Sequence, residues 1–313
     1  MLHDLFYSKG AGGSKFYLAD FIVFPCGHMK KRTIVMNLST IYQEQIDFFL
    51  REDELERSAQ YILSLPSTEV QCHLKFKDDL MVAGIPFFKA VFNRLGRSDF
   101  DFSGLDKFEG VHVQKAAGTQ AEFSLPFNIA LTGERLALNL LQRASAIATY
   151  TNKLTKSAGE VTVLDTRKTT PGLRFVEKYA VKIGGGKNHR LSQTDIWMIK
   201  DNHKNFFGGV EKAIKHFQSI SGFYQPIVLE IHDVAEIGPA QDLGIKHFLL
   251  DNFTQADIER ASEIKKPGNT YELSGGISLE NIGNYNLIGI DCISSGSLTY
   301  NAPHVDISMK INE

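Results

Sequence analysis

One short stretch of the chain, residues 165–203, gathers side chains that can bind an anion. It reads DTRKTTPGLRFVEKYAVKIGGGKNHRLSQTDIWMIKDNH, and the turns TTPG and GGG are interleaved with its cations. Its basic residues are Arg167, Lys168, Arg174, Lys178, Lys182, Lys187, His189, Arg190, Lys200 and His203. A solvated helix face would alternate Glu and Lys at i,i+4 spacing, and this stretch does not. Because the whole chain has a formal charge of −2, the segment is a local concentration of cations and indicates a pocket for a small, highly anionic ligand.

A repeated plan after residue 160 would place further polar residues on the same face of the fold. Six apolar, strand-like runs each end in a polar residue and lead into a loop and a helical segment, at a spacing of roughly 20–35 residues. This pattern predicts parallel strands joined by helices, whose carboxyl ends converge on one face of a β/α barrel. The residues that end the runs are Thr166-Arg167-Lys168, Lys200, Glu230, Asp251, Ser274-Gly275-Gly276 and Ser294-Ser295-Gly296-Ser297.

The barrel must be smaller than a standard one. About 150 residues are too few for eight β/α units, which usually need ~250 residues. We therefore expect an irregular barrel of six or seven strands.

The turns at 274–276 and 295–297 are glycine-rich loops suited to phosphate. Their backbone N–H groups can approach phosphate oxygens, helped by the positive end of the helix that follows. Gly and Ser are common in any turn, so each loop alone is a weak signal. Paired on the last two strands of a barrel, the loops are typical of a phosphate site.

The first half of the chain predicts a packing domain without chemistry of its own. Periodicity indicates a helix at 38–61, a strand at 69–83, a helix in IPFFKAVFNRLG that ends at Gly96, and sheet at 111–130.

The strongest helix signal covers residues 133–157, and we expect this helix to bridge two domains. The predicted organisation is an N-terminal extension or disordered tail at 1–35, an α/β sandwich domain at 36–148, a β/α barrel at 149–300, and a final strand at 301–313 that returns to the N-terminal domain.

Composition excludes several classes of protein. The near-neutral charge of this 313-residue chain argues against a nucleic-acid surface, which needs a basic face. Cys26, Cys72 and Cys292 lie far apart without a CxxC pair, so we expect neither a disulfide framework nor a zinc site, in keeping with a reducing compartment. The apolar run at 16–26 is well below the ~18 residues that span a bilayer.

Read in order, the blocks TRKTTPG, EKYAV, GGGxNHR and IKDNH resemble the quinolinate phosphoribosyltransferase family, also called nicotinate-nucleotide pyrophosphorylases (carboxylating). In the first half, VAGIPFFKAVF and EGVHV…PFNIALTGERLALN resemble the family's N-terminal sandwich domain. The resemblance implies an α/β fold in which an α+β sandwich precedes an irregular barrel. It also implies phosphoribosyl transfer from phosphoribosyl pyrophosphate to quinolinate with decarboxylation, which gives nicotinate mononucleotide, pyrophosphate and carbon dioxide in de novo NAD biosynthesis.

The resemblance further implies how quinolinate is bound. Quinolinate carries two carboxylates, and the planar fork of arginine bonds a carboxylate bidentately. Arg135, in GERLALN, matches an arginine that family members lend to the neighbouring subunit, which implies a homodimer or higher homo-oligomer. The positions that match the quinolinate-binding residues are Arg135, Thr166, Arg167, His189, Arg190 and Lys200.

The other substrate implied is phosphoribosyl pyrophosphate with its magnesium ion. Magnesium prefers oxygen ligands, and Glu230 and Asp251 match the family's acid pair, which would hold it directly or through water. Lys168 and Lys200 are point charges suited to pyrophosphate or to the pyridine carboxylates. The phosphoribosyl pyrophosphate site would then comprise Lys168, Glu230, Asp251, Ser274, Gly275, Gly276, Ser295, Gly296 and Ser297, and the catalytic set would be Lys168, Lys200, Glu230 and Asp251.

Three departures from the family's pattern leave alternatives open. Tyr300 stands where LTHS has its histidine, Gln193 stands where leucine is usual, and Glu52-Asp53 lacks the GDxT that bacterial members carry after it. A paralogous phosphoribosyltransferase for nicotinate or a related base, or a non-catalytic ligand-binding homologue, is the alternative. The intact TRKTTPG and IKDNH and the retained acid pair favour the enzyme, and we expect it to be cytoplasmic, with no nucleic-acid or membrane partner.

Overall fold

The computed structural model describes residues 39–53, 55–118, 120–285 and 287–312. The chain divides into two compact units, Met1–Asp53 and Glu54–Glu313. Of the first unit, the structure describes one helix, α1 (Ser39–Glu52). The N-terminal extension predicted at 1–35 lies outside the described residues.

The second unit begins with α2 (Leu55–Ser64). Helical structure was expected over 38–61, and the structure has two helices there: α1 ends at Glu52 and α2 begins at Leu55. The remaining elements all belong to this unit.

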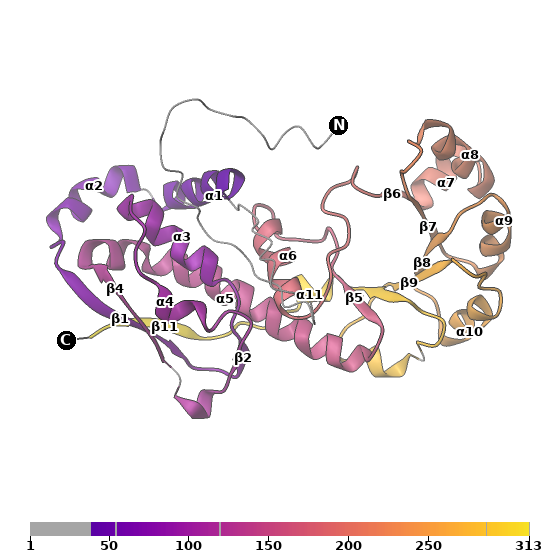
Figure 1. Ribbon diagram of the computed structural model, residues 1–313. Helices are drawn as coiled ribbons and strands as arrows, with labels where there is room; N and C mark the ends of the chain where they lie inside the picture. The colour runs from indigo at the N-terminus through magenta and orange to yellow at the C-terminus, as the bar shows by residue number, and fades with distance from the viewer. Residues whose placement is uncertain (1–38, 54, 119, 286, 313) are drawn as a thin grey trace, which may run out of the picture. The chain divides into compact units, whose positions relative to one another are not determined.

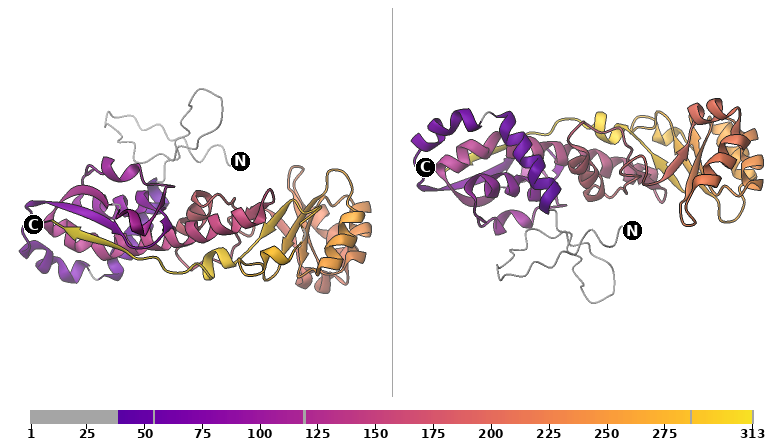
Figure 2. Two further views of the ribbon diagram at one scale, coloured as in Figure 1. Left: turned by 90° about the horizontal axis from the view of Figure 1, so that it is seen from below. Right: turned by 90° about the horizontal axis from the view of Figure 1, so that it is seen from above.

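The second unit contains an antiparallel sheet of three strands. Its order is β11-β1-β4, formed by β1 (Glu69–Phe76), β4 (Gln120–Pro126) and β11 (Ile307–Ile311). The central strand β1 pairs with β11, with Leu74 opposite Met309, so the last strand of the chain lies beside the first (Figure 2). Between β1 and β4 in the sequence, β2 (Leu80–Met81) and β3 (His112–Val113) pair as a short antiparallel ribbon.

Two helices bury the apolar core of this region. In α3 (Ile85–Gly96) and α5 (Phe127–Ala158), apolar residues recur every three or four residues, so each helix has one buried apolar face. The helices approach closely at Gly133, where a Cβ would lie 2.7 Å from the Phe92 ring. The small elements α4 (Ser103–Asp106) and η2 (Lys115–Ala117) complete the layer.

The long helix α5 carries the chain from the first sheet to the second. It packs against α3 and, further along, against α6 (Arg174–Ile183) and β5 (Thr162–Leu164). It begins six residues before the predicted start at 133, and the boundary predicted at 148/149 falls inside it.

The second sheet has six parallel strands in the order β5-β10-β9-β8-β7-β6. Helices α7 to α10 line one side of strands β6 to β9 (Figure 1). The strands after β5 are β6 (Trp197–Ile199), β7 (Ile227–Ile231), β8 (His247–Asp251), β9 (Thr270–Ser274) and β10 (Cys292–Ser294). The helical segments are α7 (Asp201–Phe207), α8 (Val210–Ile220), η3 (Val234–Glu236), α9 (Ile237–Asp242), α10 (Gln255–Glu263), η4 (Ile282–Asn284) and α11 (Ser297–Tyr300).

These strands confirm the predicted α/β fold class and the six β/α units. In the described part of the chain the hydrogen-bonded ladder stops at β5 and β6, so it does not close into a ring. A single parallel bridge between Leu164 and Lys187 adds one more segment beyond β5. The barrel is therefore irregular, with its interruption between Lys187 and β6.

A polar contact at Glu109 joins α3 to α6. The Glu109 carboxylate accepts from the backbone N–H of Gly84 at 2.9 Å and of Ile85 at 2.8 Å, at the start of α3. It also accepts from the Tyr179 hydroxyl of α6 at 2.7 Å. One side chain thus satisfies two N–H groups of a helix end that would otherwise lack partners.

Replacement of Glu109 with alanine is expected to lower the free energy of unfolding by about 2 kcal/mol, because three donors lose their acceptor. Urea denaturation measures this loss. The exposed Glu122→Gln variant on β4 is the control and should stay within about 0.5 kcal/mol of the wild type.

The contribution of Glu109 is also expected to depend on pH. Burial raises the pKa of its carboxyl, and the hydrogen bonds from Gly84, Tyr179 and Ile85 oppose that shift only in part. A raised folded-state pKa gives stability that is complete below the unfolded pKa of ~4.3 and is lost as pH rises through the folded pKa. The wild type should therefore lose stability relative to Glu109→Gln between about pH 4 and 7; parallel stability curves would contradict this.

Candidate active site

Two acids and a lysine meet at the carboxyl ends of neighbouring strands. Glu230 lies on β7 and Asp251 ends β8, and their side chains share the inner face of the sheet. Lys200, directly after β6, makes an ion pair with Glu230 Oε2. The Glu230 side chain is 7% exposed, so this carboxylate is largely removed from water. The structure therefore brings together three of the four predicted catalytic residues.

His232 completes this group and was missed by the sequence analysis. Its Nε2 lies 3.5 Å from Glu230 Oε1 and its Nδ1 lies 3.8 Å from Asp251 Oδ2, so the ring stands between the two acids. The available signal was its position two residues after Glu230, which places both side chains on one face of an extended chain. His232 also lines a pocket of about 460 Å³ together with Asp201, Lys204 and Glu236.

The block IKDNH has a structural explanation. The Lys200 backbone N–H donates to Nδ1 of His203 at 3.0 Å, which fixes the start of α7. Lys204 Nζ donates to the Glu230 carbonyl oxygen at 3.1 Å and pairs with Glu236 at 2.9 Å, so α7 is tied to the end of β7. These contacts set the distance between Lys200 and Glu230.

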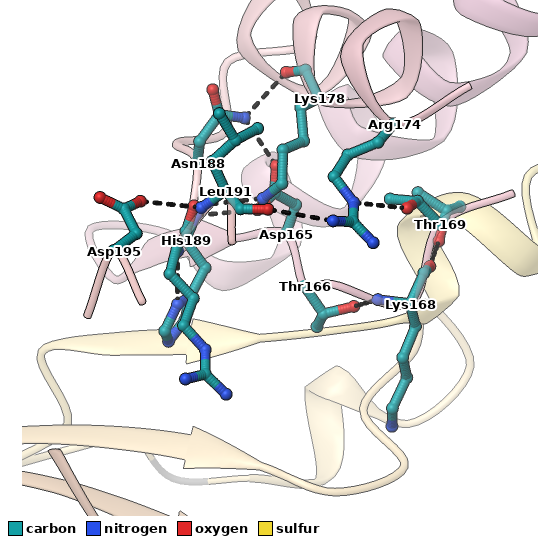
Figure 3. A network of polar contacts seen from close by, with 12 residues as sticks. Asp165, Thr166, Lys168, Thr169, Arg174, Lys178, Asn188, His189, Leu191 and Asp195 are labelled. Atoms are coloured by element: carbon teal, nitrogen blue, oxygen red, sulfur yellow. Dashed lines mark hydrogen bonds and ion pairs between the residues drawn. The ribbon is translucent and has the colours of Figure 1, made fainter. Parts of the chain in front are cut away.

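A buried network around Asp165 orders two loops that carry cations, the one that follows β5 and the one that contains Asn188 and His189 (Figure 3). Asp165 is fully buried, and its carboxylate accepts from Lys178 Nζ at 2.5 Å, from Asn188 Nδ2 at 2.6 Å and from the His189 backbone N–H at 2.8 Å. Burial is the largest influence on both charged groups. It raises the pKa of Asp165 and lowers the pKa of Lys178, and the ion pair between them opposes both shifts.

Two cations of this segment therefore do not face a ligand, which corrects the reading of the whole segment as one anion pocket. Lys178 is buried against Asp165, and Arg174 donates to the Thr169 hydroxyl and to the Leu191 carbonyl oxygen. By contrast, Arg167 and Lys168 are exposed, and their side chains make no hydrogen bond or ion pair with any described residue. Figure 3 shows the Lys168 side chain extending away from the network.

His189 is held on both sides of its ring. Nδ1 accepts from the Arg190 backbone N–H at 2.6 Å, and Nε2 lies 3.1 Å from Glu272 Oε2 on β9. Direct contact between a substrate carboxylate and Nε2 therefore requires that the substrate replace Glu272. Thr166 is also engaged, because its hydroxyl accepts from the Lys168 backbone N–H at 3.0 Å.

Arg190 faces a group of charges of both signs. Its guanidinium donates to the carbonyl oxygens of Ile196 at 2.9 Å and Gln193 at 3.3 Å. Burial, and then the positive charge of Arg167, lowers the pKa of Arg190, whereas Glu230 and Glu272 oppose this shift. The Gln193 departure falls on a residue whose backbone, not its side chain, makes this contact.

The two glycine-rich loops are built differently from each other. At 274–276, Gly275 has φ +100° and Gly276 has φ +63°, and a Cβ on Gly275 would lie 2.7 Å from the Asn252 nitrogen. Asn252 in turn donates from Nδ2 to Asp251 Oδ2 at 2.8 Å, so the loop packs directly behind this acid.

In the second loop, the serine hydroxyls have structural partners. Ser295 and Ser297 are buried, their Oγ atoms lie 2.7 Å apart, and both lie within hydrogen-bond distance of the Ile277 carbonyl oxygen, to which at least one of them donates. These side chains join the loops after β9 and β10. The Ser295 and Ser297 backbone N–H groups donate to the Leu164 carbonyl oxygen and to Ser295 Oγ, which leaves the Gly296 N–H for a phosphate. Gly296 has no room for a Cβ, which would lie 3.0 Å from Lys168 Cδ.

Arg143 and Glu177 hold the TTPG turn against this second loop, and the sequence analysis assigned them no role. Arg143 Nη2 pairs with Glu177 Oε1 at 2.6 Å and donates to the Thr299 carbonyl oxygen at 2.8 Å. Glu177 Oε2 accepts from the Thr170 backbone N–H at 3.0 Å, and the Thr299 hydroxyl donates to the Lys168 carbonyl oxygen at 2.6 Å. The signal for Glu177 was a charged residue among the apolar positions of α6.

Arg135 is the one predicted site residue that does not join this group. It is exposed near the start of α5 and makes no hydrogen bond or ion pair within the described part of the chain. That part of α5 packs against α3 at Gly133.

The acid pair fits the ligand chemistry of magnesium. Magnesium usually takes one or two carboxylates and completes its shell with water and phosphate oxygens. Across the described residues, no group of three or more His, Cys, Asp or Glu side chains is arranged to hold a metal ion by itself. The residues present thus fit an ion that arrives with a phosphate ligand.

Known proteins match the chain over both halves. The family model for the quinolinate phosphoribosyl transferase C-terminal domain matches residues 147–310. Nicotinate-nucleotide pyrophosphorylase (carboxylating) of Homo sapiens is 36% identical over 275 residues, which are 85% of this chain and 90% of that protein. Quinolinate phosphoribosyltransferase (decarboxylating) 1b of Nicotiana tabacum is 34% identical over 269 residues, 78% of this chain and 74% of its own length.

Solved structures agree. The crystal structure of NadC from Streptococcus pyogenes has a TM-score of 0.77 and 32% identity, and covers 88% of this chain and 100% of that one. The nicotinate-nucleotide pyrophosphorylase of Ehrlichia chaffeensis has a TM-score of 0.79 and 29% identity, with 88% and 100% coverage. Since the family model spans more than half of the chain and relatives are more than 30% identical across most of their length, the chain belongs to the quinolinate phosphoribosyltransferase family.

Proposed function

We propose that this protein transfers the phosphoribosyl group of phosphoribosyl pyrophosphate to quinolinate with loss of carbon dioxide, to form nicotinate mononucleotide and pyrophosphate for NAD biosynthesis. One observation carries the proposal. The acids Glu230 and Asp251 stand at the carboxyl ends of neighbouring strands, as does Lys200. Arg190 interacts electrostatically with Glu230 and with Arg167. Such a site can hold a metal-bound pyrophosphate beside a dianionic base.

Quinolinate would be bound mainly by arginines. Arg167 has a free guanidinium, and Arg190 is half-buried and close enough for the Arg167 charge to lower its pKa, so together they can pair with two carboxylates. Thr166, His189 and Lys200 border the same place, and Arg135 of a neighbouring subunit would supply a further cation. Arg135 makes no hydrogen bond or ion pair with the described residues of its own chain, which supports a homodimer or a higher homo-oligomer.

Phosphoribosyl pyrophosphate would lie across the glycine-rich loops. Lys168 is free to pair with its pyrophosphate, and backbone N–H groups of Ser274, Gly275, Gly276 and Gly296 would approach its phosphates. The N–H groups of Ser295 and Ser297 donate to the Leu164 carbonyl oxygen and to Ser295 Oγ, so these two predicted residues would shape the loop. Glu230 and Asp251 would hold magnesium directly or through water, and the ion would neutralise the leaving pyrophosphate.

The chain's own residues then contribute position and charge. The pyridine nitrogen attacks the anomeric carbon of the ribose as pyrophosphate departs, and no protein nucleophile is needed. Lys200 is held by Glu230 in this structure, and it would be available to a substrate anion if Glu230 held the metal instead. In the second stage, the positive ring nitrogen stabilises the carbanion left when the 2-carboxylate departs as carbon dioxide.

The surroundings of the site fit a protein that works in solution in a reducing compartment, and we propose the cytoplasm. Burial raises the pKa of the free thiols of Cys72 to about 11 and of Cys292 to about 12, so both stay protonated. Within the described residues, no helix has the length and apolarity needed to cross a bilayer.

The direct test is an assay of the purified protein with quinolinate, phosphoribosyl pyrophosphate and magnesium. We expect carbon dioxide and nicotinate mononucleotide in equal amounts, with quinolinate preferred over nicotinate on the order of 10⁴-fold, because nicotinate leaves a buried cation unpaired. Product from nicotinate without carbon dioxide would assign the protein to the paralogous activity. Quinolinate binding without turnover would make it a non-catalytic homologue.

Replacement of Glu230 with glutamine is expected to lower kcat on the order of 10²-fold and to raise the magnesium concentration needed for half-maximal rate. The matched control is Asp242→Asn, which removes an acid that pairs with Lys266 away from the strand ends. Unchanged magnesium dependence in Glu230→Gln would rule out the metal role of this acid.

Sharing of Arg135 between subunits predicts complementation between two inactive variants. Arg135→Ala and Arg167→Ala should each lose most activity alone. When they are coexpressed, about one quarter of the sites would regain both arginines if Arg135 crosses the interface. No recovery in purified mixed oligomers would place both arginines in the site of the same chain.

A further inference from the structure

Glu272 is a buried acid that the proposed reaction leaves without a use. It lies in the middle of β9 and is 7% exposed. Its Oε2 lies 3.1 Å from His189 Nε2, whereas its Oε1 is enclosed and has no hydrogen-bond partner among the described residues. A buried carboxylate costs free energy unless its oxygens are satisfied, so an acid kept here with one partner calls for an explanation.

The acid lies one layer below the strand-end site. Thr270, Glu272 and Ser274 alternate onto the same face of β9, and Glu272 is in register with Leu249 of the inner apolar cluster. A pocket of about 300 Å³ lies at this level, and Glu272, Thr270 and His189 line it. Glu272 is therefore too deep to meet a phosphate at the loops, and among the described residues it is hydrogen-bonded to His189.

The two contacts of His189 fix where its proton lies. Nδ1 accepts from the Arg190 backbone N–H at 2.6 Å, and a nitrogen that accepts carries no proton. The ring proton is then on Nε2 and points at Glu272 Oε2. His189 is thus held as a neutral ring in one orientation.

We propose that Glu272 is a positioning residue for the quinolinate site, acting through His189 on Arg190. The proposal rests on the proposed function. Glu272 orients the ring, the ring holds the Arg190 backbone N–H, and the Arg190 guanidinium then reaches the Ile196 carbonyl oxygen at 2.9 Å. Preorganisation of this kind spares the substrate the entropy of ordering the arginine.

The test compares Glu272→Ala with Glu272→Gln, with each substrate varied separately. In Glu272→Ala the ring loses its acceptor and can rotate, so the KM for quinolinate should rise about tenfold while the KM for phosphoribosyl pyrophosphate stays within about twofold. Glu272→Gln should restore the quinolinate KM, because the amide oxygen can accept the same hydrogen bond. Thr270→Val is the matched control, since it changes the same pocket on the same strand without touching His189.

A spectroscopic measurement reports on the ring without any substrate. In the wild type, the ¹⁵N resonances of His189, assigned with His189→Gln, should show a neutral ring protonated at Nε2, and Glu272→Ala should lose this single state. Equal KM values for quinolinate in the alanine and glutamine variants would overturn the proposal. So would a joint rise of both KM values with a lower Tm, as a merely structural role predicts, or a lower quinolinate KM in Glu272→Ala, as competition with the substrate predicts.

Failure of the proposed function would look different. If the wild type does not turn over quinolinate, the Kd for quinolinate from calorimetry replaces KM for the same variants. A wild type that neither turns over nor binds quinolinate overturns both claims, whereas binding that weakens only in Glu272→Ala supports the positioning role alone.

Discussion

The buried ion pair between Asp165 and Lys178 is the interaction on which the site depends. Asp165 directly follows β5 and Lys178 lies on α6, so the pair fixes the first barrel strand against the helix that follows it. The same carboxylate accepts from Asn188 and from the His189 backbone, and thereby also holds the loop that leads to Arg190. Charges removed from water are costly unless each finds a partner, so loss of either member would leave the other unsatisfied in the interior.

Around this pair, other polar contacts connect loops that are far apart in the sequence. Arg143 and Glu177 join α5 and α6 to the TTPG turn and to α11, and Ser295 and Ser297 join the loops after β9 and β10. The side chains left without partners, Arg167 and Lys168, stand at the ends of these braced segments. Cations carried on segments that are already rigid are suited to binding. The entropy cost of ordering these segments is met during folding and not when the ligand binds.

Periodicity predicted the parallel strands and the long helix because both depend on local patterns. It did not separate α1 from α2, and it placed the start of α5 at 133, six residues after the helix begins at Phe127. The acids at strand ends were predictable because strand direction fixes where Glu230 and Asp251 meet. The use of Lys178, Ser295 and Ser297 was not, because whether a polar side chain faces a ligand or a buried partner depends on three-dimensional contacts.

The position of β11 has a consequence for how the protein is made. β1 is the middle strand of its sheet, yet one of its two neighbours is formed by residues 307–311, the last to be synthesised among the described strands. Until those residues leave the ribosome, β1 has an open edge whose backbone groups can pair with another chain. β1 must therefore wait for a strand that is translated much later, and nascent chains are exposed to misassembly throughout that interval.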